Sequence, residues 1–414
     1  MKPEISEEDL PSLGWGGLGP IVFFADAYRT LGERRWLDLA SSGGSRLHNL
    51  LDTLDPDLPP GLFTGLAGWA VVFHELERVG LDFAGDTAKV VTVLQDRAIR
   101  GGIGVQWADT TEVLWGTAGI GFLMLTIGVE TVGDDALVLA AGAGDWLLSQ
   151  AHSVGDGLRW DLGAGPLRER PGSAELWFPN FAHGTAGIGA FLARLGEATN
   201  DDRYIEAARR AASWVLSTCR TEGDTCAAHH HNTSVRKGDS IGPARQPWDD
   251  SPMYTMGWCH GPPGLGWFFQ ELALATADAE WNGWIERTAR TVRTSGIPER
   301  REPGFWDNVG RCCGSAGVAE YFLDLHTWRD DPDDLAFALL LVDDVLARAT
   351  ADENGMRWHN VEFRRDTPEL PSETTYFQGA SGIGLALLRL SRHLDGDDSS
   401  VNWPHEPDWT RRAP

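Results

Sequence analysis

The sequence predicts an all-α fold in which seven helix-hairpin repeats close into an α/α toroid. A Gly-x-x-Gly pair that opens an apolar stretch returns along the 414 residues at spacings of 49 to 77 residues, which indicates one supersecondary element used seven times. Each unit reads as a Gly-rich inner helix that is followed, in most repeats, by an amphipathic outer helix. No repeat has the polar face of a solenoid cap, so the pattern favours a closed ring over an open solenoid. The first glycines of the seven pairs are Gly16, Gly65, Gly116, Gly184, Gly261, Gly314 and Gly379.

The inner helices are expected directly after the glycine pairs. Apolar residues recur there at helical spacing, as in 187–199, 264–276, 317–328 and 382–394. Glycine, alanine and serine at the helix starts allow the helix ends to converge where larger side chains would clash. We therefore expect these helices to line the centre of the ring.

The outer helices are expected after short polar breaks, at 203–216, 282–294 and 333–347. The breaks contain Asp and Asn residues, which suit helix N-caps. Longer loops rich in Trp, Pro and Gly, such as 157–180 and 355–376, lead from an outer helix to the next inner one. These loops deliver all seven glycine pairs to one end of the ring, where they surround a central pocket.

Composition narrows the class of protein. Hydrophobic residues make up 42% of the chain, which contains 19 Trp, and this is ample for a large core. The net charge of −25 disfavours nucleic acid or an anionic membrane as a partner, because either requires a basic face. The longest apolar run, 335–342, is too short to span a bilayer, and the first residues lack an apolar signal region, so we expect a cytoplasmic protein. Since the repeats fill the chain, we expect one domain across residues 1–414.

The residue immediately before each first glycine predicts what faces the central pocket, because equivalent positions of a repeat share one face. These residues are, in chain order, Trp15, Thr64, Trp115, His183, His260, Cys313 and Gln378. The reactive side chains therefore fall in the repeats that begin at Gly184, Gly261 and Gly314.

Three cysteines share this register. Cys259 and Cys312 each stand two residues before a first glycine, and Cys313 is next to Cys312. Three thiols can therefore converge on one ion, and we expect their position at helix N-termini to lower their pKa. Five cysteines in 414 residues do not make a disulfide scaffold, and in a reducing compartment paired cysteines more often serve metal binding or catalysis.

Zinc is the ion that this pattern favours. Zinc binds Cys sulfur in tetrahedral sites, and three protein ligands leave a fourth position open, as in catalytic sites. Three thiolates make zinc a weak Lewis acid but keep a fourth, substrate thiolate electron-rich, which suits alkylation of a thiol better than activation of water. Other interpretations stay open: an inert buried cysteine pair, a disulfide between Cys312 and Cys313, or a closed structural zinc site completed by His260.

Two histidines are candidates for proton transfer. An imidazole with an ordinary pKa of ~6.5 can deprotonate a thiol or protonate an enolate at neutral pH, and His183 is placed for both. His260 is equally well placed as ligand, supporting residue or acid, and the sequence does not decide among these roles.

Other histidines and cysteines fall outside the register. Cys219, Cys226 and the run 229–231 match no metal motif and are interpreted as incidental. The loop 220–254 contains a basic, proline-containing stretch in an acidic protein, and it is either a lid that contacts a peptide or a solvated loop.

Four motifs resemble those of the lanthionine synthetase C-like (LanC-like) family: NFAHGTAGIG at 180–189, GWCHGPPG at 257–264, GRCCGSAG at 310–317 and YFQGASGIGLALLRL at 376–390. The resemblance covers nearly the whole chain. It implies an α/α toroid with zinc at its mouth, and cyclase chemistry that adds a Cys thiol to dehydroalanine or dehydrobutyrine in a dehydrated precursor peptide. It also implies a separate dehydratase that makes those residues.

The resemblance assigns roles to individual residues. It implies that Cys259, Cys312 and Cys313 are the zinc ligands, with Cys313 where the commoner motif has His, and that His183 is the active-site histidine. Glu112, in the motif EVLWG, corresponds to an acidic residue of family cyclases. His260 stands where many bacterial cyclases have Tyr. Thr255 stands where cyclases often have Arg, a departure that bears on cyclase activity rather than on zinc binding.

The sequence therefore supports a zinc-dependent enzyme that forms thioether (lanthionine) rings in a precursor peptide. One alternative keeps the chemistry but adds glutathione or another small thiol to dehydroamino acids in damaged proteins. Another is a zinc-bearing toroid that binds peptides without turnover.

Overall fold

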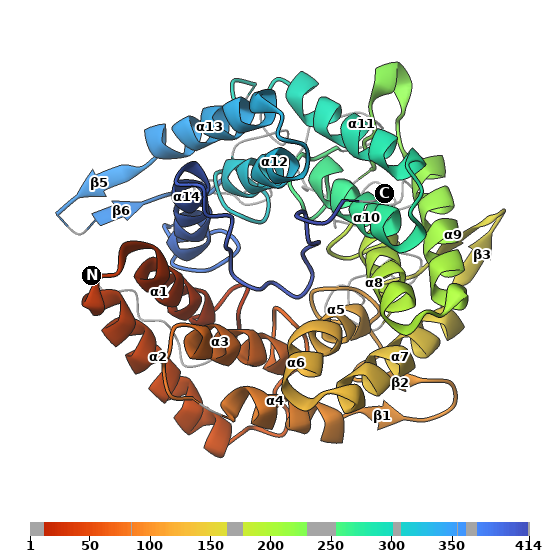
Figure 1. Cartoon of the computed structure of the whole chain (residues 1–414), viewed down its shortest axis with the longest axis horizontal. Coiled ribbons are helices and arrows are strands. Elements are labelled where there is room, and N and C mark those ends of the chain that lie inside the picture. Colours follow the sequence, from red (N-terminus) through yellow and green to blue (C-terminus); the bar gives the residue numbers. More distant parts are fainter. Residues whose placement is uncertain are drawn as a thin grey trace.

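The predicted toroid is confirmed. A computed structural model describes residues 12–83, 85–163, 177–229, 254–300, 308–353, 355–361 and 371–412 of the protein. Figure 1 shows its helices as two concentric rings around one centre. The inner ring consists of α1 (Leu18–Leu31), α3 (Leu66–Arg78), α5 (Thr117–Leu123) continued by a π-helical turn η2 (Met124–Gly128) and α6 (Val129–Val132), α8 (Thr185–Thr199), α10 (Pro262–Thr276), α12 (Ser315–Arg329) and α14 (Ala380–Leu394).

The outer ring alternates with the inner one along the chain. It consists of α2 (Arg34–Asp52), α4 (Asp86–Asp96), α7 (Asp134–Ser149), α9 (Asp202–Thr218), α11 (Glu280–Thr294) and α13 (Pro332–Ala347). Asp201 and Asp331 accept hydrogen bonds from the backbone N–H two residues later and so cap α9 and α13, as the polar breaks predict. In the described chain α14 has no outer partner, because residues 395–412 instead run across the middle of the ring towards α10 (Figure 1).

Three small antiparallel hairpins project from the ends of outer helices. They pair β1 (Ile99–Arg100) with β2 (Val105–Gln106), β3 (His152–Val154) with β4 (Gly157–Arg159), and β5 (Thr350–Asp352) with β6 (Gly355–Arg357). A 3₁₀ turn, η4 (Glu222–Asp224), lies in the connection after α9.

The inner helices form the core, and the outer helices cover it. Every residue of α10 from Pro262 to Ala273 is buried, whereas α9 buries one stripe that includes Tyr204, Ala208 and Val215. This difference is the expected one between a helix packed on all sides and an amphipathic helix at the surface. None of the described helices combines the length and the apolar character that a membrane crossing requires.

The repeated glycines have a steric cause. A Cβ atom on the second glycine of a pair would meet the backbone carbonyl oxygen of the residue six positions earlier, at 2.0 Å for Gly187, 2.1 Å for Gly264 and 1.8 Å for Gly317. The preceding loop therefore folds back over the start of each inner helix. Its carbonyl groups accept hydrogen bonds from the first N–H groups of the helix, as from Thr185 N to Phe178 O at 2.9 Å.

The loops that precede the inner helices form a nearly closed circle of backbone hydrogen bonds, which we call the collar. The bonds run from Gly14 N to Phe63 O, Phe63 N to Leu114 O, Val113 N to Ala182 O, Ala182 N to Cys259 O, Cys312 N to Phe377 O and Phe377 N to Gly14 O, at 2.9 to 3.3 Å. Six of the seven neighbouring pairs of loops are joined in this way. Among the described residues, the pair without such a bond is the one that carries Cys259 and Cys312.

Candidate metal centre and active site

Three thiols meet at the gap in the collar. The sulfur of Cys313 lies 3.3 Å from that of Cys259 and 3.4 Å from that of Cys312, and all three sulfurs lie within 4.8 Å of one another. None of the three cysteines is in a disulfide, so the structure does not support the disulfide between Cys312 and Cys313. Cys259 and Cys312 are buried and Cys313 is half-buried.

The spacing of the sulfurs fits a metal ion. Three thiolates at about 2.3 Å from a tetrahedral ion lie about 3.8 Å apart, so a small outward movement of each sulfur makes room for one. Soft sulfur ligands select zinc or another thiophilic ion over magnesium or calcium. The cluster could therefore hold a metal ion, and its half-buried member leaves one side open.

The prediction that the helix N-termini lower the thiol pKa values is wrong for Cys259 and Cys312. Hydrogen bonds with Cys259 and Cys313, together with burial, raise the pKa of Cys312 well above its ordinary value. For Cys259 the hydrogen bond with Cys312 lowers the pKa, but the hydrogen bond with Cys313 and burial raise it by more. The helix α10 begins with Pro262 and Pro263, which have no N–H, and the first N–H groups of α12 are bonded to the preceding loop, so both helix N-termini offer few free N–H donors to a thiolate.

A buried carboxylate holds His183. Glu112 Oε2 lies 2.8 Å from Nδ1 of His183, and Glu112 also accepts hydrogen bonds from the backbone N–H groups of Leu114 at 3.0 Å and Trp115 at 2.6 Å. The side chain of Glu112 is fully buried, whereas that of His183 is 12% exposed. The contact fixes the orientation of the imidazole and places the Nδ1 proton towards the carboxylate.

His260 lies next to both groups. Its ring centroid is 5.3 Å from that of His183, and the residue directly follows Cys259 in the chain. Buried Asn180 donates from Nδ2 to the carbonyl oxygen of His260 at 3.1 Å and to that of His229 at 2.8 Å. The structure thus brings Glu112, His183, His260 and the three cysteines to one mouth of the ring.

The aromatic residues of this mouth are not among the catalytic or metal-binding residues that the sequence predicts. The indole of Trp115 stacks on the imidazole of His183 with a centroid distance of 4.8 Å, and Trp15 stacks on Trp115 at 6.3 Å. Trp15 is 44% exposed, so this aromatic row (Trp15, Trp115 and His183) leads from solvent to the imidazole. The repeat pattern could have identified this row, because Trp15, Trp115 and His183 all stand immediately before the first glycine of a pair.

The cysteines outside the register form a pair of their own. Cys226 is buried beside half-buried Cys219 at the end of α9, and their mutual hydrogen bond and burial raise the pKa of Cys219 well above its ordinary value. A thiol in such an environment is poorly reactive. His230, His231 and the rest of the basic loop as far as residue 253 lie outside the described residues, while Thr255 is described and half-buried.

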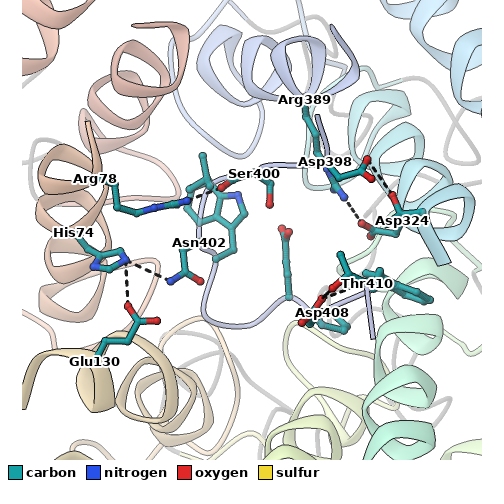
Figure 2. Close-up of a pocket in the computed structure, with 16 residues that line it drawn as sticks. His74, Arg78, Glu130, Asp324, Arg389, Asp398, Ser400, Asn402, Asp408 and Thr410 are labelled. Atoms are coloured by element: carbon teal, nitrogen blue, oxygen red, sulfur yellow. Dashed lines mark hydrogen bonds and ion pairs between the residues drawn. The ribbon is translucent and has the colours of Figure 1, made fainter. Parts of the chain in front are cut away.

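A cavity of about 560 Å³ lies at the other end of the inner helices and contains no cysteine. Figure 2 shows that its polar side chains contact one another or the backbone: Arg389 contacts Asp324, His74 lies 3.6 Å from Glu130, and Arg78 donates to the carbonyl oxygen of Ser400 at 3.2 Å. The cavity forms where the inner helices end, whereas the three cysteines lie where they begin.

Comparisons with known proteins agree with this architecture. Nisin cyclase has 14% sequence identity over 97% of this chain and 92% of its own, with a TM-score of 0.66. A GH76 alpha-mannanase of Bacteroides thetaiotaomicron has 12% identity over 80% of this chain and 84% of its own, with a TM-score of 0.49. An unsaturated glucuronyl hydrolase of Bacillus sp. GL1 has 16% identity over 93% and 88%, with a TM-score of 0.48.

At these identities the likeness to nisin cyclase shows the fold alone, and the other two TM-scores support no conclusion. No curated protein sequence matches the chain. The profile of the family described as lanthionine synthetase C-like protein matches residues 8–404. Because this match spans nearly the whole chain, the protein belongs to the lanthionine synthetase C-like family.

Proposed function

We propose that the protein is a zinc-dependent cyclase that adds a Cys thiol of a dehydrated precursor peptide to a dehydroalanine or dehydrobutyrine of the same peptide, which forms a thioether ring. One observation supports the proposal most: three thiols, with sulfur-to-sulfur distances of 3.3 and 3.4 Å, lie at the same mouth as His183, whose imidazole is bound by the buried carboxylate of Glu112. Thiol addition needs a place to bind a thiolate and a group that moves protons, and this mouth offers both.

Cys259, Cys312 and Cys313 are the ligands in this proposal. Zinc on these thiolates would supply a fourth position for the substrate thiolate and would keep that sulfur nucleophilic. The side chains of Cys259 and Cys312 are buried, so the open position would lie towards half-buried Cys313 and the mouth of the ring.

His183 handles the protons. With its Nδ1 proton directed to Glu112, the neutral ring carries its lone pair on Nε2 and can take the proton of the incoming thiol. The sulfur then bonds to Cβ of the dehydroamino acid, the carbon–carbon double bond becomes a single bond, and the proton is returned to Cα. His260, at a centroid distance of 5.3 Å from His183, is the candidate for a second proton carrier.

The reaction consumes an alkene that must be made beforehand. We propose that a separate dehydratase supplies it by removing water from Ser or Thr of the precursor. We also propose a cytoplasmic location, where thiols such as those of this chain stay reduced.

A second candidate adds glutathione or another small thiol to dehydroamino acids in damaged proteins. It is favoured by Thr255, which stands four residues before Cys259 where the resemblance leads us to expect Arg, and by His260 in the motif GWCHG. In that reaction the thiol and the dehydroamino acid belong to different molecules, so the mouth would not have to bend one peptide into a ring.

Two assays on the purified protein separate these functions. The first uses a dehydrated peptide that contains Cys, and the second uses a dehydroalanine peptide with glutathione; the products are identified by mass and by the loss of alkylatable thiol. Rings in the first assay support the cyclase, and an adduct in the second alone supports the small-thiol transferase.

Variants tie the product to the site. We expect Cys313→Ser and His183→Asn to abolish product, and Cys219→Ser to leave it unchanged as a matched control outside the cluster. Bound zinc without product in either assay would instead indicate a peptide-binding toroid. A protein that binds no zinc, or in which Cys259→Ser changes nothing, would contradict the metal centre.

A further inference from the structure

The segment after α14 crosses the ring where the inner helices end, and we call residues 395–412 the C-terminal strap (Figure 1). Side chains of several inner helices bind its backbone. Figure 2 shows part of this contact, in which Ser400 and Asn402 lie beside Arg78 and His74 of α3. Further bonds run to the backbone of the strap from Arg392 Nε to Ser399 O at 2.9 Å, from Arg194 Nη2 to Glu406 O at 2.7 Å and from Gln270 Nε2 to Arg411 O at 3.1 Å.

One strap residue reaches the base of the Cys312 loop. Arg311, which immediately precedes Cys312, is 2% exposed, and its Nη2 donates to Oε1 of Glu406 at 2.7 Å. The same guanidinium pairs with Glu320 of α12 and donates to the hydroxyl of Tyr376. Glu406 is therefore one of two carboxylates that neutralise a buried charge one residue from a thiol of the cluster.

The neighbouring strap residue reaches the base of the Cys259 loop. His405 is fully buried, and its ring centroid lies 5.5 Å from that of Trp258, the residue immediately before Cys259. Phe63 and Trp267 flank the same imidazole at 5.1 and 5.7 Å. Among the described residues neither ring nitrogen has a hydrogen-bond partner, so the imidazole packs as a neutral aromatic ring.

Trp258 and Arg311 are held from two sides. Their carbonyl oxygens face Gly264 and Gly317, where even one Cβ atom would collide with them, at 2.1 and 1.8 Å respectively. Their side chains face the strap. A shift of His405 or Glu406 would therefore move the backbone that carries Cys259 and Cys312. The described part of the chain has no backbone hydrogen bond across this junction of the collar.

We infer that the C-terminal strap is a positioning element for the cysteine cluster, and that His405 and Glu406 set the distance between Cys259 and Cys312 from beneath. The inference rests on the proposed function in that it takes the cluster to be a metal site. It assigns both residues a role through Trp258 and Arg311, not a contact with metal or substrate.

Cobalt in place of zinc tests the inference directly, because its thiolate charge-transfer and visible bands report the number and geometry of sulfur ligands. Full-length Glu406→Ala and His405→Ala are compared with the wild type by titration with Co²⁺ in competition with a chelator. Because Arg311 stays paired with Glu320 in Glu406→Ala, we expect this variant to fold. Circular dichroism checks that it does. We expect either variant to bind Co²⁺ about 10- to 100-fold more weakly, with shifted visible bands, as is usual when a support of a metal ligand is removed.

Two further variants separate positioning from general damage. Glu406→Gln keeps an oxygen acceptor for Arg311 and should restore most of the affinity and the wild-type spectrum. Asp408→Ala removes an exposed strap carboxylate that bonds only within the strap among the described contacts, to Thr410 N at 3.0 Å, and should change neither. Wild-type affinity and spectrum in folded Glu406→Ala and His405→Ala would overturn the inference, as would an equal loss in Asp408→Ala. Absence of Co²⁺ binding in the wild type would overturn the proposed metal centre instead.

Should Glu406→Ala fail to fold, Glu406→Gln and His405→Ala carry the test. An unchanged Co²⁺ spectrum and affinity in folded His405→Ala would overturn the inference, and a changed spectrum in His405→Ala beside a wild-type spectrum in Glu406→Gln would support it.

Discussion

Glu112 links the fold to the chemistry at the scale of single residues. One fully buried carboxylate accepts two backbone N–H groups and holds the imidazole of His183, so the residue has both a structural and a functional use. Such a group cannot be replaced by an amide without loss, since an amide has one accepting oxygen instead of two.

We therefore predict that Glu112→Gln lowers the free energy of unfolding by about 1–3 kcal/mol, because one backbone N–H loses its acceptor. It should also slow product formation by about 100-fold or more, because His183 loses its fixed orientation. Urea unfolding and the peptide assay measure the two effects. Glu130→Gln changes a half-exposed carboxylate that lies 3.6 Å from His74, and it should alter neither quantity. Equal behaviour of the two variants would contradict the role given to Glu112.

The aromatic row leads to a second prediction at this scale. Trp15 is 44% exposed and contacts Trp115 and Phe377. If the peptide lies on the row, Trp15→Ala removes one ring contact worth about 0.5–1.5 kcal/mol and raises KM about two- to tenfold with little change in kcat. Leu346→Ala, at a residue equally exposed on α13, is the matched control. A fall in kcat with unchanged KM would place Trp15 outside the peptide-binding surface.

At the scale of elements, the second glycine of each pair leaves room for the preceding loop to pack against the start of the inner helix. Gly317→Ala would bring a Cβ atom within 1.8 Å of the carbonyl oxygen of Arg311, so we predict a loss of about 1–3 kcal/mol in the free energy of unfolding. Weaker metal binding should accompany it, because Arg311 precedes Cys312. Gly283 lies in outer helix α11 with open space around it, and Gly283→Ala should stabilise the protein by about 0.5–1 kcal/mol. Thermal unfolding of both variants, with and without zinc, measures these effects. Equal changes in the free energy of unfolding for Gly317→Ala and Gly283→Ala would contradict the steric explanation.

The burial of His405 in the C-terminal strap leads to a prediction about how stability depends on pH. Burial, with smaller contributions from the charges of Arg311 and Arg194, lowers the pKa of His405 well below its ordinary value. The unfolded chain takes up a proton below about pH 6.5 that the folded state does not, so stability is lost as the pH falls, by up to about 1.4 kcal/mol per pH unit from this residue. His405→Phe should remove this part of the dependence. We expect the difference in the free energy of unfolding between His405→Phe and the wild type to grow from pH 7.5 to pH 5.5 in urea unfolding. A constant difference would show that His405 is not buried in its neutral form.

The sequence predicted those parts of the protein that the repeat controls. The register placed His183, His260, Cys259, Cys312 and Cys313 at one mouth, because equivalent positions of a ring of helices must face alike. The strap follows no period, so nothing in the sequence joins Glu406 to Arg311 across 95 residues. Helix N-termini alone predict lowered pKa values for Cys259 and Cys312, and this prediction fails because Pro262 and Pro263 have no N–H to donate and contacts among the thiols cannot be read from the sequence.

At the scale of the whole molecule, the stability of the ring depends on the junction of the collar between the Cys259 and Cys312 loops. Six backbone hydrogen bonds join the loops, and sulfur atoms occupy the seventh junction. An ion held by Cys259, Cys312 and Cys313 would join the loops of two repeats, so binding it should stabilise the fold as well as serve the reaction.

Metal removal should therefore lower the thermal stability of the entire ring. Free zinc at 1,000 times its Kd stabilises a protein by about 4 kcal/mol, provided that the unfolded chain does not bind it. We predict that a chelator lowers Tm in the wild type, and that neither chelator nor zinc changes Tm in Cys313→Ala. Scanning calorimetry checks this, with chelator followed by excess zinc as the test of reversal. A wild type whose Tm ignores zinc would mean that the ion does not join the two loops.

The collar also has an evolutionary consequence. Its frame consists of backbone atoms and of glycines that exclude side chains, so the residue before each first glycine can change without disturbing the frame. Thr64 and Gln378 now occupy positions equivalent to those of His183 and Cys313. The mouth thus has seven structurally equivalent positions. A substitution at any one of them can add a new chemical group while the rest of the repeat preserves the fold.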